Sequence, residues 1–275
     1  MAKLTRKLWI GIGAATIAGA SLGSGATAQQ PPHKGHTPPP AAGNEKATST
    51  PDQGGEAYLT DGGPRDTRIR FYRDIALTRG HILVGSQLIE LGLWDEALPH
   101  FLHPTEELYG VMEKYIKLHN IRPFRHELQA LAQAVKAKRK GAYDQAAKVV
   151  DQRLEAALAV ARRFMTPLLG FTAKSAAEVL KVALSEYESS IEDGHFAKPV
   201  EYQDSRGFVW QAERMLEGAA AELKKADPAA FARIRSALAE LKTAWPAPMP
   251  PEKPIVEPGK MSALISDIEL HASRY

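Results

Sequence analysis

Apolar residues recur at steps of three and four along most of this 275-residue chain, beginning near Arg68. The first stretch of this kind carries Ile69, Tyr72, Ile75, Ala76, Leu83 and Leu88. Such spacing puts apolar side chains on one face of an α-helix, whereas a half-buried strand alternates apolar and polar residues. No stretch groups β-branched residues with a period of two. The sequence therefore predicts an all-α fold.

Turn signals divide this pattern into about six to eight helices. The helix from Arg68 should end near Gly92, and a second should start at Asp95 or Glu96. Another should begin at Pro104, because the fixed φ and missing N–H of proline suit a first helical turn. Further helices are expected over residues 127–139, 143–164, 173–190, 207–225 and 227–244, with a polar loop over 191–206. Short connections favour an antiparallel bundle.

The first 28 residues are typical of a signal peptide. Lys3, Arg6 and Lys7 precede an apolar run, and Ala26-Thr27-Ala28 is typical of a cleavage site. We therefore expect residues 29–275 to be exported to the bacterial periplasm. Removal of the signal leaves 32 of the 35 basic residues and all 32 acidic ones, so the mature chain is formally neutral.

Composition divides the rest of the chain into three parts. Residues 29–65 are rich in proline and glycine and poor in large apolar residues, which predicts a disordered linker. Residues 66–245 should form the helical domain, which is long enough to bury its own core. Residues 246–275 begin as a proline-rich strap and end in a short amphipathic helix, which we expect to pack back on the domain.

Composition also excludes several kinds of site and partner. The chain has no cysteine, which rules out disulfides, cysteine nucleophiles and thiolate metal sites. A neutral mature chain does not favour nucleic-acid binding, which needs a basic surface. After the signal, no run of 18 apolar residues occurs, so no transmembrane segment is expected.

The densest group of possible metal ligands is the segment from His100 to Glu107. His100 and His103 with Glu106 and Glu107 supply nitrogen and oxygen donors of the kind that bind iron, copper or zinc. Since one short segment cannot surround an ion, His81 or Glu90 of the preceding helix should complete the site. The interpretation without a metal is that the two carboxylates face the positive end of a helix and the histidines pack at a helix junction.

Residues 103–109 add a family resemblance. His103-Pro104-Thr105-Glu106, followed by Leu108-Tyr109, resembles the H-x-x-E motif of the imelysin-like family. Members of that family are periplasmic or surface-attached helical bundles, and some are iron-uptake components. The resemblance implies a metal-binding or metal-delivery protein, iron or copper ahead of zinc, with a periplasmic or membrane protein as a possible partner.

A scaffold without metal is the alternative. The segments around Gly92 and Gly141 look like the turns of tetratricopeptide helix pairs, although they are 49 residues apart rather than 34. Enzyme motifs are incomplete: His126-Glu127 lacks the second histidine of a zinc-protease motif, because Ala130 stands in its place. We therefore expect a binding protein rather than an enzyme.

Overall fold

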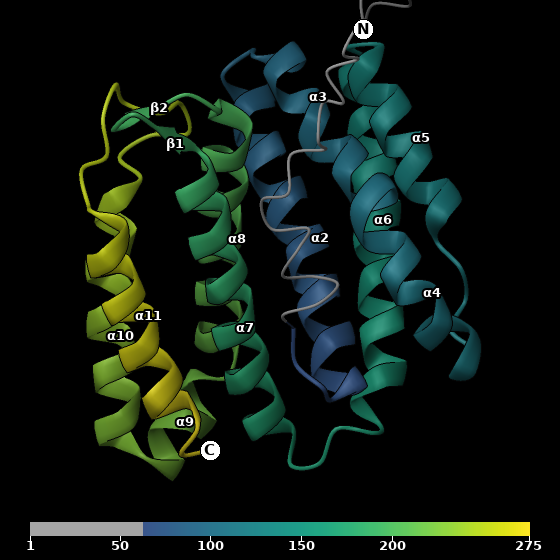
Figure 1. Ribbon diagram of the computed structural model, residues 1–275. Coiled ribbons are helices and arrows are strands. Elements are labelled where there is room, and N and C mark those ends of the chain that lie inside the picture. The colour runs from purple at the N-terminus through teal and green to yellow at the C-terminus, as the bar shows by residue number, and fades with distance from the viewer. Residues whose placement is uncertain (1–62) are drawn as a thin grey trace, which may run out of the picture. The chain divides into compact units, whose positions relative to one another are not determined.

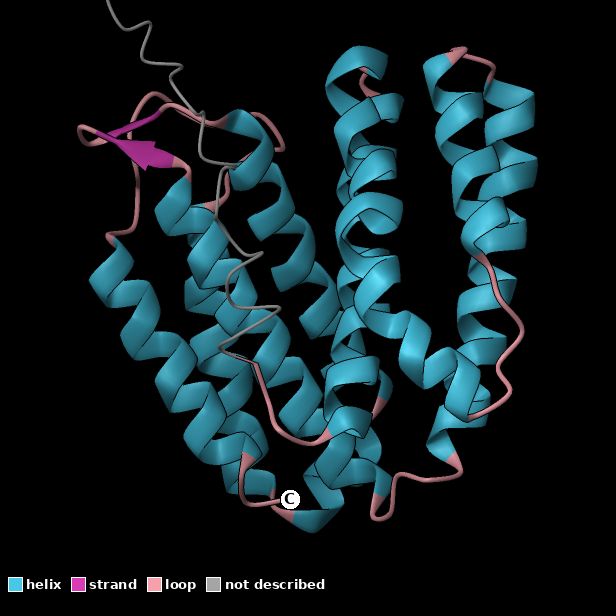
Figure 2. Cartoon of the chain, turned by 45° about the vertical axis from the view of Figure 1, so that its right-hand side comes forward, coloured by secondary structure: helices cyan, strands magenta, loops and turns pink. Residues whose placement is uncertain are grey.

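The computed structural model describes residues 63–275, and most of these are helical (Figure 1). The predicted all-α fold is confirmed. Within the described range the only strands are two short ones, which stand out in magenta in Figure 2. The expected signal peptide, and residues 29–62 of the expected linker, lie outside the described residues.

The elements follow one another in two groups. The first comprises α2 (Thr67–Glu90), α3 (Trp94–His103), the π-helix η2 (Pro104–Leu108), α4 (Tyr109–Leu118), α5 (Arg125–Lys136) and α6 (Lys140–Arg162). The second comprises α7 (Leu168–Ser189), β1 (Ile191–Glu192), β2 (His195–Phe196), α8 (Pro199–Gly218), α9 (Ala220–Ala226), α10 (Pro228–Leu241), the 3-10 helix η3 (Lys242–Ala244) and α11 (Pro258–Ala272).

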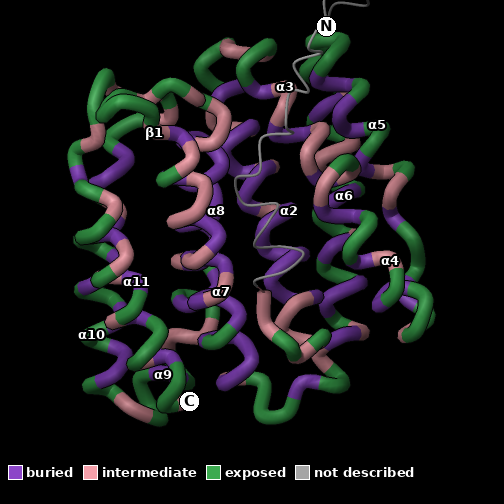
Figure 3. Tube along the Cα trace, viewed as in Figure 1, coloured by how far each residue is buried: buried purple, intermediate pink, exposed green. Residues whose placement is uncertain are grey.

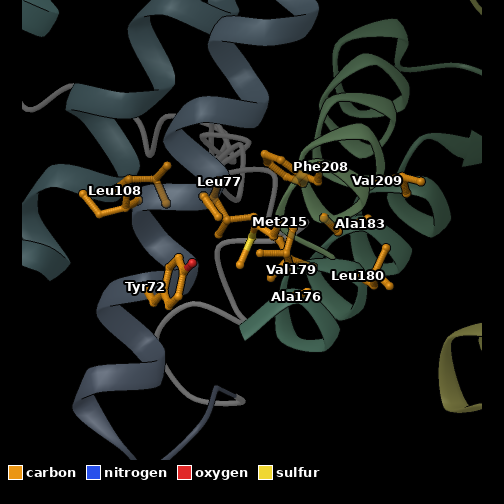
Figure 4. Packing of buried hydrophobic residues seen from close by; sticks show 14 of the residues in the cluster. Tyr72, Leu77, Leu108, Ala176, Val179, Leu180, Ala183, Phe208, Val209 and Met215 are labelled. Carbon is orange, nitrogen blue, oxygen red and sulfur yellow. The ribbon is translucent and has the colours of Figure 1, made fainter. Parts of the chain in front are cut away.

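Helix α2 is the central element of the described domain. It packs against α3 and α6 on one side and against α7 and α8 on the other (Figure 1). Burial therefore extends around most of its circumference, as the purple tube in Figure 3 shows. Leu77, for example, is buried between Leu108 of η2 and Phe208 of α8 (Figure 4). A helix that is buried around most of its circumference needs this many neighbours to cover its apolar surface.

Two glycines allow α2 and α8 to come into backbone contact. A Cβ atom added to Gly207 would lie 2.4 Å from the carbonyl oxygen of Gly80, and one added to Gly80 would lie 2.6 Å from a ring carbon of Phe208. Real Cβ atoms do not approach other atoms so closely, so neither position has room for a side chain. This contact fixes the distance between two of the helices that carry the site described below.

The helix expected to start at Pro104 does not start there. Instead α3 continues into α4 through η2, in which the N–H of Tyr109 donates to the carbonyl of Pro104, five residues earlier. The cause is Pro104, which cannot donate to the carbonyl of His100 and whose ring would collide with it. The helix widens by one residue over a single turn rather than breaking, which is how π-helices usually occur.

The expected loop at 191–206 is also partly wrong. Residues 191–196 form a hairpin in which Ile191 pairs with Phe196, and α8 then begins at Pro199. Pro199 occupies the first turn, and Glu201 places a negative charge near the positive end of the helix. As a result, residues 202–206 are helical and buried rather than part of a polar loop.

The chain turns as expected at Gly92, whose φ is +80°, but not at Gly141. Gly141 lies inside α6, and the turn before that helix is made at Lys138, whose φ is +51°. The helix pair α5–α6 therefore has its turn outside the segment that suggested a tetratricopeptide repeat.

The C-terminal part packs back on the helices. Met261, Ile265 and Ile268 of α11 are buried where that helix meets α7 and α10. The preceding strap is held by Tyr187, whose hydroxyl donates to the carbonyl of Val256 at 2.9 Å. Among residues 63–275, none of the helices is both long and apolar enough to cross a membrane.

Candidate metal centre

Three histidines converge on the carboxylate of Asp204. The Nδ1 atoms of His81 and His100 lie 2.6 and 2.7 Å from its Oδ1 atom. The Nδ1 atom of His103 lies 3.0 Å from Oδ2. With each Nδ1–H donating, one carboxylate accepts three hydrogen bonds, and the Nε2 atoms of His81 and His103 point away from it. In metal sites, a ligating histidine usually donates its other N–H to a carboxylate in this way.

Three helices bring these side chains together. His81 lies on α2 directly after Gly80, and Asp204 lies on α8 one turn before Gly207. The glycine contact between α2 and α8 therefore places the carboxylate beside His81. His100 and His103 are one turn apart on α3, which packs against both helices.

A second carboxylate faces the same histidines from the π-helix. Oε1 of Glu107 lies 3.7 Å from Nε2 of His103. One possible ligand atom from each of His81, His103 and Glu107 lies within 4.8 Å of the other two. In the wide turn of η2, residue 107 rather than 106 falls beneath His103. Two imidazoles and one carboxylate with open positions form the donor set typical of non-haem iron.

His100 has a different role, because both of its ring nitrogens are engaged. Its Nδ1 atom contacts Asp204, and its Nε2 atom lies 2.8 Å from Oε1 of Gln203. The His100 side chain is fully buried. It also belongs to a second, wholly buried group of possible ligands with His81 and Asp204. Because its contacts are already complete, we interpret His100 as a residue that orients Asp204 rather than as a ligand.

Burial and charge act in opposite directions on the pKa values of this cluster. Burial alone would raise the pKa of Asp204, but the neighbouring imidazoles hold it well below its usual value. Burial lowers the pKa of His81, more than Asp204 raises it. Burial also acts to lower the pKa of His103, but Asp204, Glu107 and Glu186 outweigh it and raise that pKa to about 9. The negative charge of the carboxylates therefore favours a cation here.

Four of the six residues proposed from the sequence lie in this cluster: His81, His100, His103 and Glu107. The other two do not. Glu106 is exposed, whereas Glu107, four residues after His103, lies on the same face of the helix as that histidine. Glu90 is exposed at the end of α2, nine residues after His81 and on a different face of the helix.

Sequence reasoning missed Asp204 and Gln203 as members of the site, because both fell in a stretch read as a loop. The signal that identifies them is Lys198-Pro199-x-Glu201, which is typical of a helix N-terminus. A helix starting there continues without a break through Tyr202, Val209 and Leu216, and it buries the polar residues 203–206.

His103 makes the stability of the metal-free protein depend on pH. Its pKa is raised from 6.5 to about 9 in the folded state. The charged imidazole therefore stabilises the fold fully below pH 6.5, and this contribution is lost as the pH rises through about 9. We expect His103→Gln to remove on the order of 2 kcal/mol of pH-dependent stability across this window. Urea unfolding of chelator-treated protein at several pH values measures it. The control is His126→Gln, which changes an exposed histidine. If the free energy of unfolding depended on pH equally in the parent and in His103→Gln, the raised pKa of His103 would be contradicted.

Comparison with known protein families gives a match over one region of the chain. Residues 168–274 match the model of a family described as the iron permease-associated 4-helix bundle domain. The long helices of that region are α7, α8, α10 and α11 (Figure 1). No curated protein and no solved structure matches the chain significantly. The matched residues include Asp204 and Glu186 but none of the three clustered histidines.

Proposed function

We propose that this protein binds a transition-metal ion, iron before copper or zinc, as cargo for an iron permease, and that it does so in the periplasm and without catalysing a reaction. The observation that carries the proposal is the convergence of His81, His103 and Glu107 around the hydrogen-bonded carboxylate of Asp204. The iron permease-associated match supports iron. The imelysin-like motif at His103 favours the same metal.

The donor atoms support iron on chemical grounds. Imidazole and carboxylate ligands suit Fe²⁺ and Zn²⁺, and the chain offers no thiolate that would favour Cu⁺ or a structural zinc site. The side chains of His103 and Glu107 are each about one fifth to one quarter exposed, at 21% and 24%. An ion therefore has access from solvent on the side opposite the buried Asp204. A site that is open on one side suits a protein that must release its ion.

Metal binding should be stoichiometric and should depend on His103. Calorimetric titration of the mature, tag-free protein with Fe²⁺ under anaerobic conditions should give one ion per chain. His103→Ala should weaken binding by more than the roughly 10–100-fold typical of losing an outer-shell residue. His126→Ala should bind like the parent. A scaffold protein would instead give no stoichiometric binding to the parent chain, and that result would refute the proposal.

Affinity should also fall as the pH is lowered. An imidazole must be neutral to bind a metal, and the pKa of His103 is about 9 in the metal-free protein. Around neutral pH the ion therefore displaces a proton from His103, so affinity should rise from about pH 6 to about pH 9. Titrations in buffers of different ionisation enthalpy count the released protons. Release of no proton near neutral pH would contradict His103 as a ligand.

A further inference from the structure

A groove of about 840 Å³ runs along the face of α2 that points away from the metal centre. Arg79 and Leu83 line it, whereas His81 between them contacts the carboxylate of Asp204. Helices α6, α7 and α8 form its walls. The lining of α2 extends over residues 72–90, a length of about 27 Å at 1.5 Å per residue. The function proposed above does not use this groove.

One end of the groove is lined by apolar side chains from several helices. Leu158 of α6, Leu168 of α7 and Met215 of α8 line it together with Tyr72 of α2. Leu158 and Met215 are buried, and Leu168 is 42% exposed at the edge of the groove. Such a surface can remove an apolar chain from water but offers it no hydrogen bond.

Farther along the groove, hydrogen-bond donors lack acceptors. Gln211 of α8 lines the groove and is only 6% exposed, yet no side-chain hydrogen bond among residues 63–275 involves its amide. Arg214, one turn later, forms no ion pair within that range. Nε of Arg79 is buried and has no acceptor there either. Buried polar groups without partners are rare in folded proteins, so a ligand should supply the missing acceptor.

The course of α2 and α8 brings these three donors to one level of the groove. The two helices run antiparallel and meet where Gly207 approaches the carbonyl of Gly80. Arg79 lies directly before that point on α2, and Gln211 and Arg214 lie one and two turns after it on α8. Side chains of a helix lean toward its N-terminus, so those of Gln211 and Arg214 reach back toward the contact, while that of Arg79 reaches toward them.

The charges of the lining are separated along the groove. Its arginines other than Arg214 are offset by two carboxylates of α6, at distances of 2.6–3.2 Å. The lining acids without an ion pair among residues 63–275 are Glu90 and Glu222. Glu90 is about three turns from Arg79, and Glu222 about two turns from Arg214, toward opposite ends of the groove. The middle of the groove therefore has one uncompensated positive charge, which suits a monoanion.

We propose that this groove binds a single-chain amphiphile with a carboxylate head group, of the fatty-acid type. The carboxylate accepts hydrogen bonds from the Gln211 amide and the Arg214 guanidinium and offsets the charge of that arginine. Arg79 offers its Nε atom as a further donor at the same level. The alkyl chain lies along the apolar end of the groove, beside Leu168 and Met215. Because groove and metal centre lie on different faces of α2, this binding does not depend on the metal.

A series of ligands tests the chain and the head group separately. The metal-free mature protein is titrated calorimetrically with butyrate, hexanoate, octanoate and decanoate, each below its micelle concentration. Each further CH₂ group that is buried should strengthen binding by about fourfold. The uncharged 1-decanol has the same chain as decanoate and should bind more weakly by about tenfold or more, because it lacks the charge-assisted hydrogen bonds.

Variants locate the two parts of the ligand. Gln211→Leu and Arg214→Gln should each weaken decanoate binding by about tenfold. Leu168→Gln should weaken the binding of decanoate but not that of butyrate. The matched control is Arg233→Gln, which changes an exposed arginine of α10 outside the groove and should bind decanoate like the parent. His103→Ala should also bind decanoate like the parent, which separates this test from that of the metal centre.

The outcomes that would overturn the proposal are distinct. Absence of saturable decanoate binding would show that the groove takes no such ligand. Equal affinity for decanoate and 1-decanol would show that the donors do not bind a carboxylate. Decanoate binding that survives both Gln211→Leu and Arg214→Gln would place the head group elsewhere. Circular dichroism of each variant checks that its helices are intact.

Discussion

Asp204→Asn should abolish tight metal binding and lower the free energy of unfolding by about 3 kcal/mol. The carboxylate accepts from three imidazoles, and its side chain is only 4% exposed. An amide keeps one acceptor oxygen and turns an NH₂ group toward at least one imidazole N–H. The substitution therefore leaves buried donors without a partner and removes the charge that orients His81 and His103. Urea unfolding and calorimetric titration with Fe²⁺ measure the two effects.

The control for this substitution is Asp144→Asn. Asp144 pairs with Lys140 on the surface of α6, where both side chains are more than half exposed. Exposed pairs contribute little, so this change should alter stability by less than about 0.5 kcal/mol and leave binding unchanged. An Asp204→Asn protein that binds Fe²⁺ as well as the parent would show that the carboxylate does not organise the site.

Gly207→Ala should be about as damaging, although it adds only a methyl group. The new Cβ atom would lie 2.4 Å from the carbonyl oxygen of Gly80, so α8 must move away from α2. Overpacking of this kind costs about 1–3 kcal/mol, and here the obstacle is backbone that cannot rotate away. Asp204 is one turn away on the same helix, so the separation also lengthens its contact with His81. We expect a lower denaturation midpoint together with weaker metal binding.

Gly110→Ala should have the opposite effect. Gly110 lies inside α4, and a Cβ atom there would meet nothing within 4 Å. Alanine favours the helix over glycine by roughly 0.5–1 kcal/mol, so this variant should be more stable than the parent and bind metal equally well. If Gly207→Ala were stabilising too, the backbone contact would not be as close as described.

The sequence allowed the fold class to be predicted, together with four residues of the cluster, for physical reasons that differ between residues. Helical periodicity is a local property, so the helices around His81 and His100 could be identified from their own residues. Glu106 was included as the last residue of the H-x-x-E motif that begins at His103, but in the structure it is exposed, and Glu107 is the carboxylate that lies beside His103. Asp204 was missed because its segment looks polar, and its burial results from packing against α2 and α3.

The family match and the candidate site involve different parts of the chain. The matched residues 168–274 contribute Asp204, Gln203 and Glu186, whereas His81, His100, His103 and Glu107 come from the preceding helices. A fragment that contains only the matched region should therefore lack the imidazole ligands. The matched region also runs across residue 245, because α11 packs with α7 and α10 as part of the same group of helices.

The separation of these residues along the chain sets the order in which the site can form during synthesis. Asp204 is 123 residues from His81, 104 from His100 and 101 from His103. The imidazoles therefore leave the ribosome long before the carboxylate that orients them, and contacts between such distant residues form late in folding. A growing chain that ends before α8 carries the histidines without their arrangement. It can hold an ion only loosely, so tight metal binding begins once α8 has packed against α2.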